Sequence, residues 1–158
     1  MNIQELKVIK NVTQTLKNGG VILYPTDTIW GIGCDATNKE AIKKVYAIKK
    51  REKEKSLIIL VNNTKMLEKY IKQVPNIAYK IIEKQIEPTT IIYQNPIKLP
   101  DLLTDKNTVA IRVIKEKNIN KLLEDFDKPI TSTSANISNQ RNPNNFSEID
   151  DDLSLIHI

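Results

Sequence analysis

A chain of 158 residues with 40% hydrophobic residues and a formal charge of +5 is long enough to bury one core, so we expect a single soluble domain. No apolar run approaches the roughly 20 residues of a membrane helix, and residues 1–11 lack the apolar core of a signal peptide. The single cysteine, Cys34, excludes a disulfide framework and a zinc cluster built on several thiolates. We therefore expect a protein of the reducing cytoplasm in which Cys34 packs as a small core residue.

The hydrophobic periodicity alternates between helix-like and strand-like spacing along the chain. Helices are predicted over residues 3–16, from a cap at Thr37 or Asn38 to about Arg51, and over 64–71, 75–86 and 117–126. Strands are predicted over residues 21–24, 57–61, 89–93, 108–113, 129–133 and 153–158. This alternation indicates a single α/β domain that includes some antiparallel pairing.

Residues 24–35 (YPTDTIWGIGCD) form the most informative stretch, and we interpret them as a loop between a buried strand and a helix. Pro25 ends the strand because proline cannot donate a ladder hydrogen bond. The loop that follows such a strand is the usual ligand site of an open α/β sheet, and the hydroxyls of Thr26 and Thr28 are free to face a ligand there. Glycines at 31 and 33 let a backbone pass close to that ligand. An ordinary polar turn explains the same composition.

Residues 39–55 hold eight basic side chains against three acidic ones. Lys49 and Arg51 stand at the end of the helix predicted there, with one residue between them, and lysine and arginine together suit phosphate oxygens. A basic stretch beside a candidate site indicates a nucleotide or nucleic-acid ligand. The alternative is a solvated, lysine-rich helix face.

The third polar cluster follows the predicted strand 129–133. Alternate residues of an extended segment share a face, so Ser132, Ser134 and Asn136 can project together and offer neutral donors and acceptors. Arg112, near the end of another strand, adds a clamp for a carboxylate or phosphate. The only histidine, His157, lies at the C-terminus, which argues against a serine–histidine pair. The residues alone thus predict an α/β protein that positions and polarises an anionic ligand.

Four segments, in this order and spacing, resemble the YrdC-like family, the threonylcarbamoyl-AMP synthases of tRNA modification. They are residues 20–35, the Lys49-x-Arg51 pair, residues 108–113 (TVAIRV) and residues 128–138 (KPITSTSANIS). The resemblance implies a twisted, mixed, mostly parallel open sheet with flanking helices around a positively charged concavity. It also implies one domain over residues 1–158 that lacks the usual C-terminal end of the family.

The implied activity is that of a nucleotidyltransferase that joins L-threonine, bicarbonate and ATP into threonylcarbamoyl-AMP and releases pyrophosphate. Mg²⁺ would accompany ATP, with no metal held by the protein and no covalent nucleophile. By motif, the threonine site comprises Thr26, Arg112 and Ser132. The ATP site comprises Lys49, Arg51, Thr108, Ser134 and Asn136. The implied partners are enzymes that pass the threonylcarbamoyl group to adenosine 37 of tRNA, with a direct contact to tRNA or double-stranded RNA. The alternative is a non-catalytic relative of the same fold that binds RNA or a nucleotide.

Overall fold

The computed structural model describes residues 3–26, 29–50, 57–137 and 140–149. Within these ranges the α-helices are α1 (Ile3–Lys17), α2 (Lys39–Ile48), α3 (Thr64–Glu68), α4 (Asn76–Lys84) and α5 (Lys117–Phe126). The strands are β1 (Val21–Tyr24), β2 (Gly31–Cys34), β3 (Ile58–Val61), β4 (Ile91–Gln94), β5 (Thr108–Val113) and β6 (Ile130–Ser134). Short 3₁₀ turns cover Asp101–Leu103 and Phe146–Glu148.

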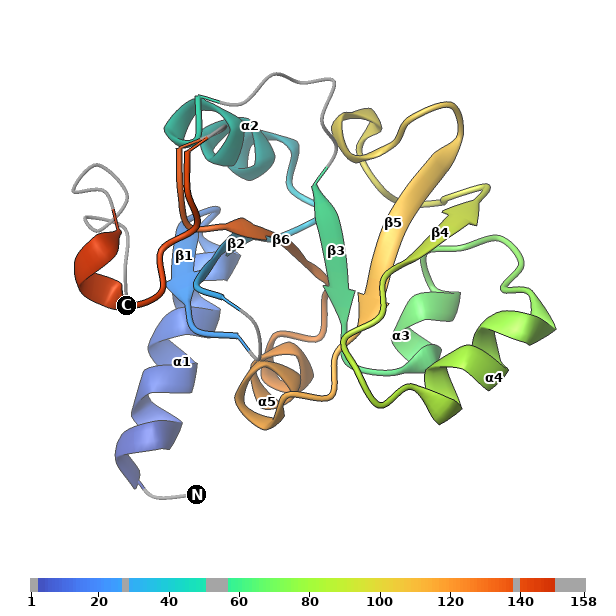
Figure 1. Ribbon diagram of the computed structural model, residues 1–158, viewed down its shortest axis with the longest axis horizontal. Helices are drawn as coiled ribbons and strands as arrows, with labels where there is room; N and C mark the ends of the chain where they lie inside the picture. Colours follow the sequence, from blue (N-terminus) through green and yellow to red (C-terminus); the bar gives the residue numbers. More distant parts are fainter. Residues whose placement is uncertain (1–2, 27–28, 51–56, 138–139, 150–158) are drawn as a thin grey trace.

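The strands form one six-stranded sheet in the order β1-β2-β6-β3-β5-β4 (Figure 1). Four of the five neighbouring pairs are antiparallel, and only β3 and β5 run parallel. The mixed α/β class is confirmed, but the prediction of a mostly parallel sheet is wrong. Helix α2 does connect two strands of the same direction, β2 and β3, but β6 inserts between them in the opposite direction. Residues 25–30, which join β1 to β2, are too few for the crossover that a parallel pair needs, and β1 and β2 pair antiparallel.

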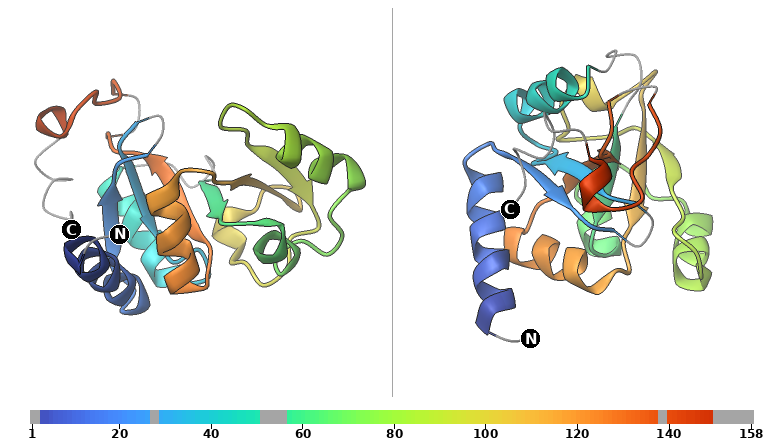
Figure 2. Two further views of the ribbon diagram at one scale, coloured as in Figure 1. Left: turned by 90° about the horizontal axis from the view of Figure 1, so that it is seen from below. Right: turned by 60° about the vertical axis from the view of Figure 1, so that its left-hand side comes forward.

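Helices cover both faces of the sheet, and each side has its own hydrophobic cluster. On one face α1 packs against α5, and their apolar side chains meet strand residues such as Ile22, Leu60 and Ile130. The two further views show α1 and α5 side by side (Figure 2). On the other face α2, α3 and α4 bury strand residues such as Ile59 and Ile111. Period-2 alternation along the strands thus sorts the apolar side chains into two layers.

Most predicted elements are confirmed, and their ends have identifiable causes. Helix α1 is followed by Gly19 at φ +71°, the left-handed conformation expected there. Asn38 caps α2 by accepting hydrogen bonds from the backbone N–H groups of residues 40 and 41. The expected loop over 24–35 is partly wrong, because β2 occupies residues 31–34. The strand predicted at 153–158 lies outside the described residues.

Cys34 is fully buried in the larger hydrophobic cluster, as expected of a core residue. Burial raises the pKa of its thiol to about 12, which keeps the sulfur protonated and unreactive. None of the helices in the described part of the chain combines the length and apolar character that a membrane crossing requires.

Candidate functional site

The loop between β1 and β2 closes against the end of β6 and forms a small pocket with β3 and β5. Its volume is about 110 Å³, which suits an amino acid and is too small for a whole nucleotide. The residues that line it are Thr26, Ile29, Trp30, Gly31, Ile58, Leu60, Arg112, Ile114, Ser132, Thr133 and Ser134. The pocket therefore gathers four of the predicted site residues, namely Thr26, Arg112, Ser132 and Ser134.

Arg112 carries the only charge among the lining residues that the structure describes. It extends from β5, directly opposite Leu60 of β3. Its Nε donates a hydrogen bond of 3.0 Å to Oγ1 of Thr90, which fixes the plane of the guanidinium. The other N–H donors of the guanidinium can grip a carboxylate or phosphate in a bidentate manner.

Thr26 lines the pocket, but its hydroxyl is engaged by the protein. Its Oγ1 donates to the backbone oxygen of Ile29 at 2.7 Å and accepts from the backbone N–H of Ile29 at 3.2 Å. This double contact closes the loop after Pro25. The expectation that the Thr26 hydroxyl is free to face a ligand is thus corrected, and a ligand would have to share or replace these contacts. Thr28 lies outside the described residues.

The glycines of β2 admit a neighbouring side chain. A Cβ at Gly31 would stand 3.1 Å from the ring of Tyr24, and one at Gly33 would stand 3.1 Å from the same ring. The Gly33 Cβ would also lie 2.2 Å from the backbone oxygen of Thr131 on β6. Our expectation that both glycines serve the approach of a ligand is corrected for Gly33, which allows β2, β6 and Tyr24 to pack this closely. Gly31 also lines the pocket.

Lys49 lies behind the pocket at the C-terminal end of α2, with a side chain only 1% exposed. Its Nζ donates to the backbone oxygen of Ser134 and lies 3.4 Å from the Ser134 hydroxyl and 3.3 Å from Oδ1 of Asn136. The Ser134 hydroxyl in turn donates to Oδ1 of Asn136. The structure thus joins three of the predicted ATP-binding residues in one polar cluster that meets the pocket at Ser134.

Two other described lysines of the basic stretch, Lys43 and Lys44, have partners within the protein. Lys43 forms an exposed ion pair with Glu40 at 2.8 Å, and Lys44 donates to the backbone oxygen of Gly19 at 2.8 Å. For this part of α2 the alternative of a solvated, lysine-rich helix face is the better description. Residues 51–55 of the stretch, including Arg51, lie outside the described residues, so the positively charged concavity stays a prediction.

Thr108 is the one described candidate that does not join the others. It begins β5, four positions before Arg112, which is roughly 13 Å along an extended strand. Its hydroxyl donates to the backbone oxygen of Asp105 in the preceding turn at 2.7 Å. Thr108 shares the face of Arg112 on β5, but it is not among the residues that line the pocket.

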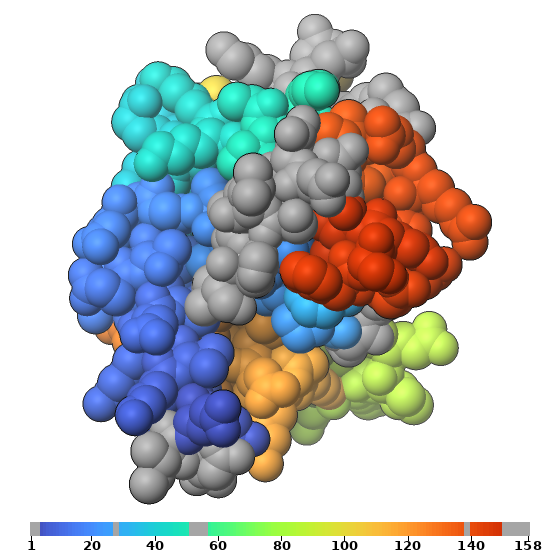
Figure 3. Space-filling view, turned by 90° about the vertical axis from the view of Figure 1, so that its left-hand side faces the viewer, coloured from blue at the N-terminus to red at the C-terminus, as the bar shows by residue number. Residues whose placement is uncertain are grey.

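Sequence reasoning missed the apolar part of the pocket wall. Ile58, Leu60 and Ile114 look like ordinary core residues, and only the packing of β3 beside β5 turns them toward the pocket. Trp30 also lines the wall, and its ring meets that of Phe146 edge to face with 5.5 Å between centroids. Phe146 comes from the segment 140–149, which lies on the surface, orange to red in Figure 3. No local signal predicts that contact.

The fold and the pocket together define an α/β protein with a small pocket of mixed polar and apolar lining. The ligand that fits carries one anionic group for Arg112, hydrogen-bonding groups for Ser132 and Ser134, and an apolar part for the isoleucine and tryptophan wall. Within the described residues no group of three or more histidine, cysteine, aspartate or glutamate side chains could hold a metal ion.

Comparisons with known proteins place this chain in a family. The Sua5/YciO/YrdC family model, whose description reads "telomere recombination", matches residues 14–157. The threonylcarbamoyl-AMP synthase of Photobacterium profundum is 37% identical over 137 residues, covering 82% of this chain and 72% of the relative. That of Buchnera aphidicola is 38% identical over 130 residues, covering 78% and 73%. The chain therefore belongs to the Sua5/YciO/YrdC family.

Solved structures agree with the family assignment. P. abyssi Sua5 in complex with L-threonine matches with a TM-score of 0.87 and 28% identity over 94% of this chain. E. coli YciO matches with a TM-score of 0.73 and 26% identity over 88% of this chain. The chain covers 44% of that Sua5 chain and 68% of YciO, so it spans less than half of the larger relative.

Proposed function

We propose that this chain is a threonylcarbamoyl-AMP synthase, a nucleotidyltransferase that forms threonylcarbamoyl-AMP and pyrophosphate from L-threonine, bicarbonate and ATP for tRNA modification. The observation that carries the proposal is the convergence of Thr26, Arg112 and Ser132 on one pocket of amino-acid size. The curated relatives named threonylcarbamoyl-AMP synthase and the Sua5 complex with L-threonine support it.

In this proposal the pocket binds threonine through complementary groups. Arg112 pairs with the carboxylate, while Ser132 and the loop at Thr26 meet the polar groups on the other carbons. The apolar wall at Ile58 and Leu60 accommodates the methyl group. The neutral amine of threonine, held in this way, forms a C–N bond with the carbon of bicarbonate, with loss of water, or with that of CO₂ derived from it, with loss of a proton. Either route gives a carbamate.

The nucleotide would lie beyond Ser134, against the polar cluster with Lys49 and Asn136 and with Arg51 nearby in the sequence. The carbamate oxygen attacks the α-phosphorus of ATP, and pyrophosphate leaves. Such a transfer requires alignment of the reactants and neutralisation of phosphate charge and needs no covalent nucleophile. Thr108 would contact the nucleotide only if the ligand extended along β5.

Mg²⁺ fits this chemistry as a companion of ATP. The described residues offer no acidic cluster for a resident metal, and Mg²⁺ is commonly held mainly by substrate phosphates and water. The enzymes that use the product, and a direct contact with tRNA, belong to the same proposal.

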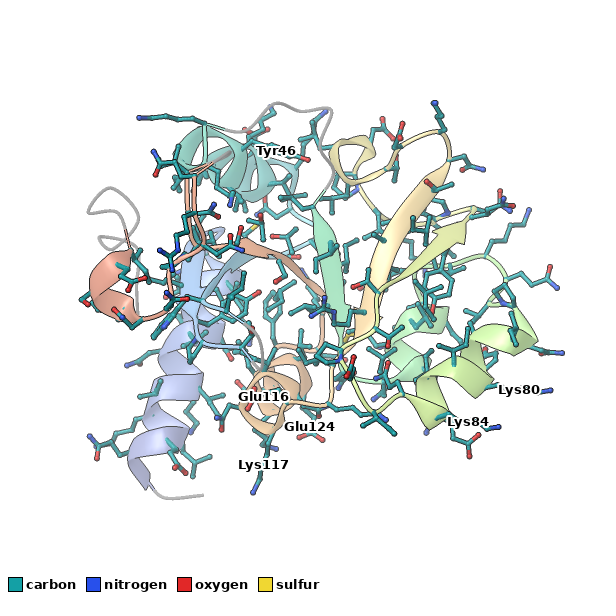
Figure 4. The ribbon with its side chains drawn as sticks, in the orientation of Figure 1. Tyr46, Lys80, Lys84, Glu116, Lys117 and Glu124 are labelled. Atoms are coloured by element: carbon teal, nitrogen blue, oxygen red, sulfur yellow. The ribbon has the colours of Figure 1, made fainter. Side chains whose placement is uncertain are left out.

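The test is pyrophosphate release from ATP, with L-threonine and bicarbonate omitted in turn. The proposal expects release only when both are present, and an Arg112→Lys variant whose KM for threonine rises about tenfold or more because the bidentate fork is lost. The control is Lys84→Gln on α4, labelled in Figure 4. Lys84 is not among the residues that line the pocket, so the KM for threonine and kcat should stay unchanged.

Two results would contradict the proposal. Pyrophosphate release without threonine would indicate a different acceptor. An absence of release, together with RNA binding that weakens steeply with salt, would instead favour the non-catalytic RNA-binding alternative.

A further inference from the structure

Thr90 is a half-buried residue directly before β4, and no sequence motif or pocket lining assigns it a role. Strand β4 is the edge strand beside β5 (Figure 1). The register of this antiparallel pair sets Ile91 opposite Ile111, so one position further along Thr90 stands opposite Arg112. Side chains at opposed positions share a face of the sheet and meet. The Thr90 hydroxyl accordingly accepts the hydrogen bond of 3.0 Å from Nε of Arg112.

This hydrogen bond decides which edge of the guanidinium can meet a ligand. A guanidinium holds a carboxylate in a bidentate manner either through Nε and one Nη or through its two Nη groups. Because the Nε–H of Arg112 donates to Thr90, the first edge is occupied. The edge formed by the two Nη groups remains for a bidentate ligand, so the carboxylate is expected to approach the guanidinium end-on.

Without Thr90, Arg112 would have a second place to turn. Its side chain borders two hollows, the ligand pocket of about 110 Å³ and a smaller hollow of about 40 Å³ beside the segment that precedes β4. Glu87, an exposed residue, lines the smaller hollow together with Arg112. A carboxylate there is a competing partner for a guanidinium that has lost its contact on Nε. The choice between the two hollows therefore depends on the hydrogen bond to Thr90.

We propose that Thr90 is a positioning residue whose hydroxyl holds the guanidinium of Arg112 at the ligand pocket and away from Glu87. The two Nη groups are then available to the carboxylate of the bound amino acid. This inference rests on the proposed function, which supplies threonine as the ligand. Thr90 itself does not line the pocket and acts through Arg112.

The experiment removes the Thr90 hydroxyl while keeping the shape of the side chain, in Thr90→Val. Thr90→Ala removes it by a second route, so the test does not depend on how well valine is accommodated. Thr90→Ser keeps the hydroxyl and is the conservative variant. Thr89→Val is the matched control, because Thr89 is also half-buried and its hydroxyl donates to the backbone oxygen of Glu87 at 2.9 Å, outside the pocket lining.

Threonine affinity is measured both with and without turnover. Steady-state pyrophosphate release gives KM for threonine and kcat. Trp30 is the only tryptophan of the chain and lines the pocket, so its fluorescence during titration with L-threonine reports binding at the pocket wall. Calorimetric titration gives the same Kd independently. All titrations are done well below the melting temperature of each variant, so a loss of stability does not obscure the result.

We expect Thr90→Val and Thr90→Ala to raise KM and Kd for threonine about three- to tenfold with little change in kcat, because one hydrogen bond that orients the binding group is lost. Thr90→Ser and Thr89→Val should stay close to the wild type. Adding Glu87→Gln to Thr90→Val should recover most of the lost affinity, whereas Glu87→Gln alone should change little. On the Arg112→Lys background, Thr90→Val should add almost nothing, because lysine has no Nε–H to hold.

Unchanged threonine binding in Thr90→Val and Thr90→Ala would overturn the inference. An undiminished loss on the Arg112→Lys background, or no recovery with Glu87→Gln, would overturn it too. These results leave the proposed function standing, since the wild-type protein still releases pyrophosphate in a threonine-dependent manner. A wild-type protein that neither binds threonine nor releases pyrophosphate overturns the proposed function, and this inference with it.

Discussion

The close contact at Gly33 yields a quantitative prediction about stability. In a Gly33→Ala variant the new Cβ would stand 2.2 Å from the backbone oxygen of Thr131, roughly 1 Å short of an ordinary contact. A backbone oxygen cannot rotate away, so β2 and β6 must separate. The hydrogen bond of 3.1 Å from the backbone N–H of Cys34 to Oγ1 of Thr131 lies at the same place and would be strained.

We expect Gly33→Ala to lower the free energy of unfolding by about 3 kcal/mol, the upper range for overpacking a close-packed interior. Gly31→Ala is the matched control. Its Cβ would stand 3.1 Å from the ring of Tyr24, and a side chain can shift by the few tenths of an ångström required. We expect about 1 kcal/mol there.

The assay is equilibrium unfolding in urea, with the slope of the transition compared between variants. In thermal unfolding, 3 kcal/mol corresponds to a fall of roughly 6–12 °C for a domain of this size. A Gly33→Ala protein within about 0.5 kcal/mol of wild type, or less destabilised than Gly31→Ala, would refute the reasoning.

Three further predictions concern residues away from the pocket. Because burial raises the pKa of Cys34 to about 12, a thiol reagent at pH 8 should leave the native protein unmodified and react fully after unfolding in guanidinium chloride. Because the pKa of Cys34 is higher in the native state than in the unfolded chain, the native state favours the protonated thiol. The stability from this preference is present below about pH 9 and is lost as the pH rises toward 12. The melting temperature of Cys34→Ala should therefore decline less at alkaline pH than that of the wild type. Lys106 and Asn107 both have positive φ, at 45° and 63°, in the two-residue turn before β5. Asparagine tolerates this conformation better than lysine, so Lys106→Asn should stabilise the protein by about 0.5 kcal/mol in the urea assay, and a loss of stability would contradict the turn geometry.

Much of the local structure follows from the sequence. The periodicity of α5 predicts a helix that buries one face, and the continuous apolar run of β1 predicts a strand buried on both faces; both lie close to their observed bounds. Asn38 and Gly19 mark helix ends through their own backbone chemistry. The motif order also identifies Thr26, Arg112, Ser132 and Ser134 before any of them is placed in space.

The order of the strands and the closure of the site depend on tertiary structure. No local feature of the sequence indicates that β6, the last described strand along the chain, inserts between β2 and β3. Because β6 runs antiparallel to both, the expected parallel pairing of neighbouring strands is lost there. That insertion brings Ser132 into the same pocket as Arg112, with β3 between their strands, and draws Thr131 against Gly33. It also sets the partners of Lys49, whose contacts at Ser134 and Asn136 are more than 80 positions away in the chain.

The physical reason for this division is range. Helix caps, turns and alternation depend on interactions within a few residues, which the sequence records directly. The pocket depends on contacts between strands distant along the chain, and these form only where both sheet faces and the two helix layers can be buried together. The sequence by itself determined which residues could carry the chemistry, and the tertiary structure decided which of them meet.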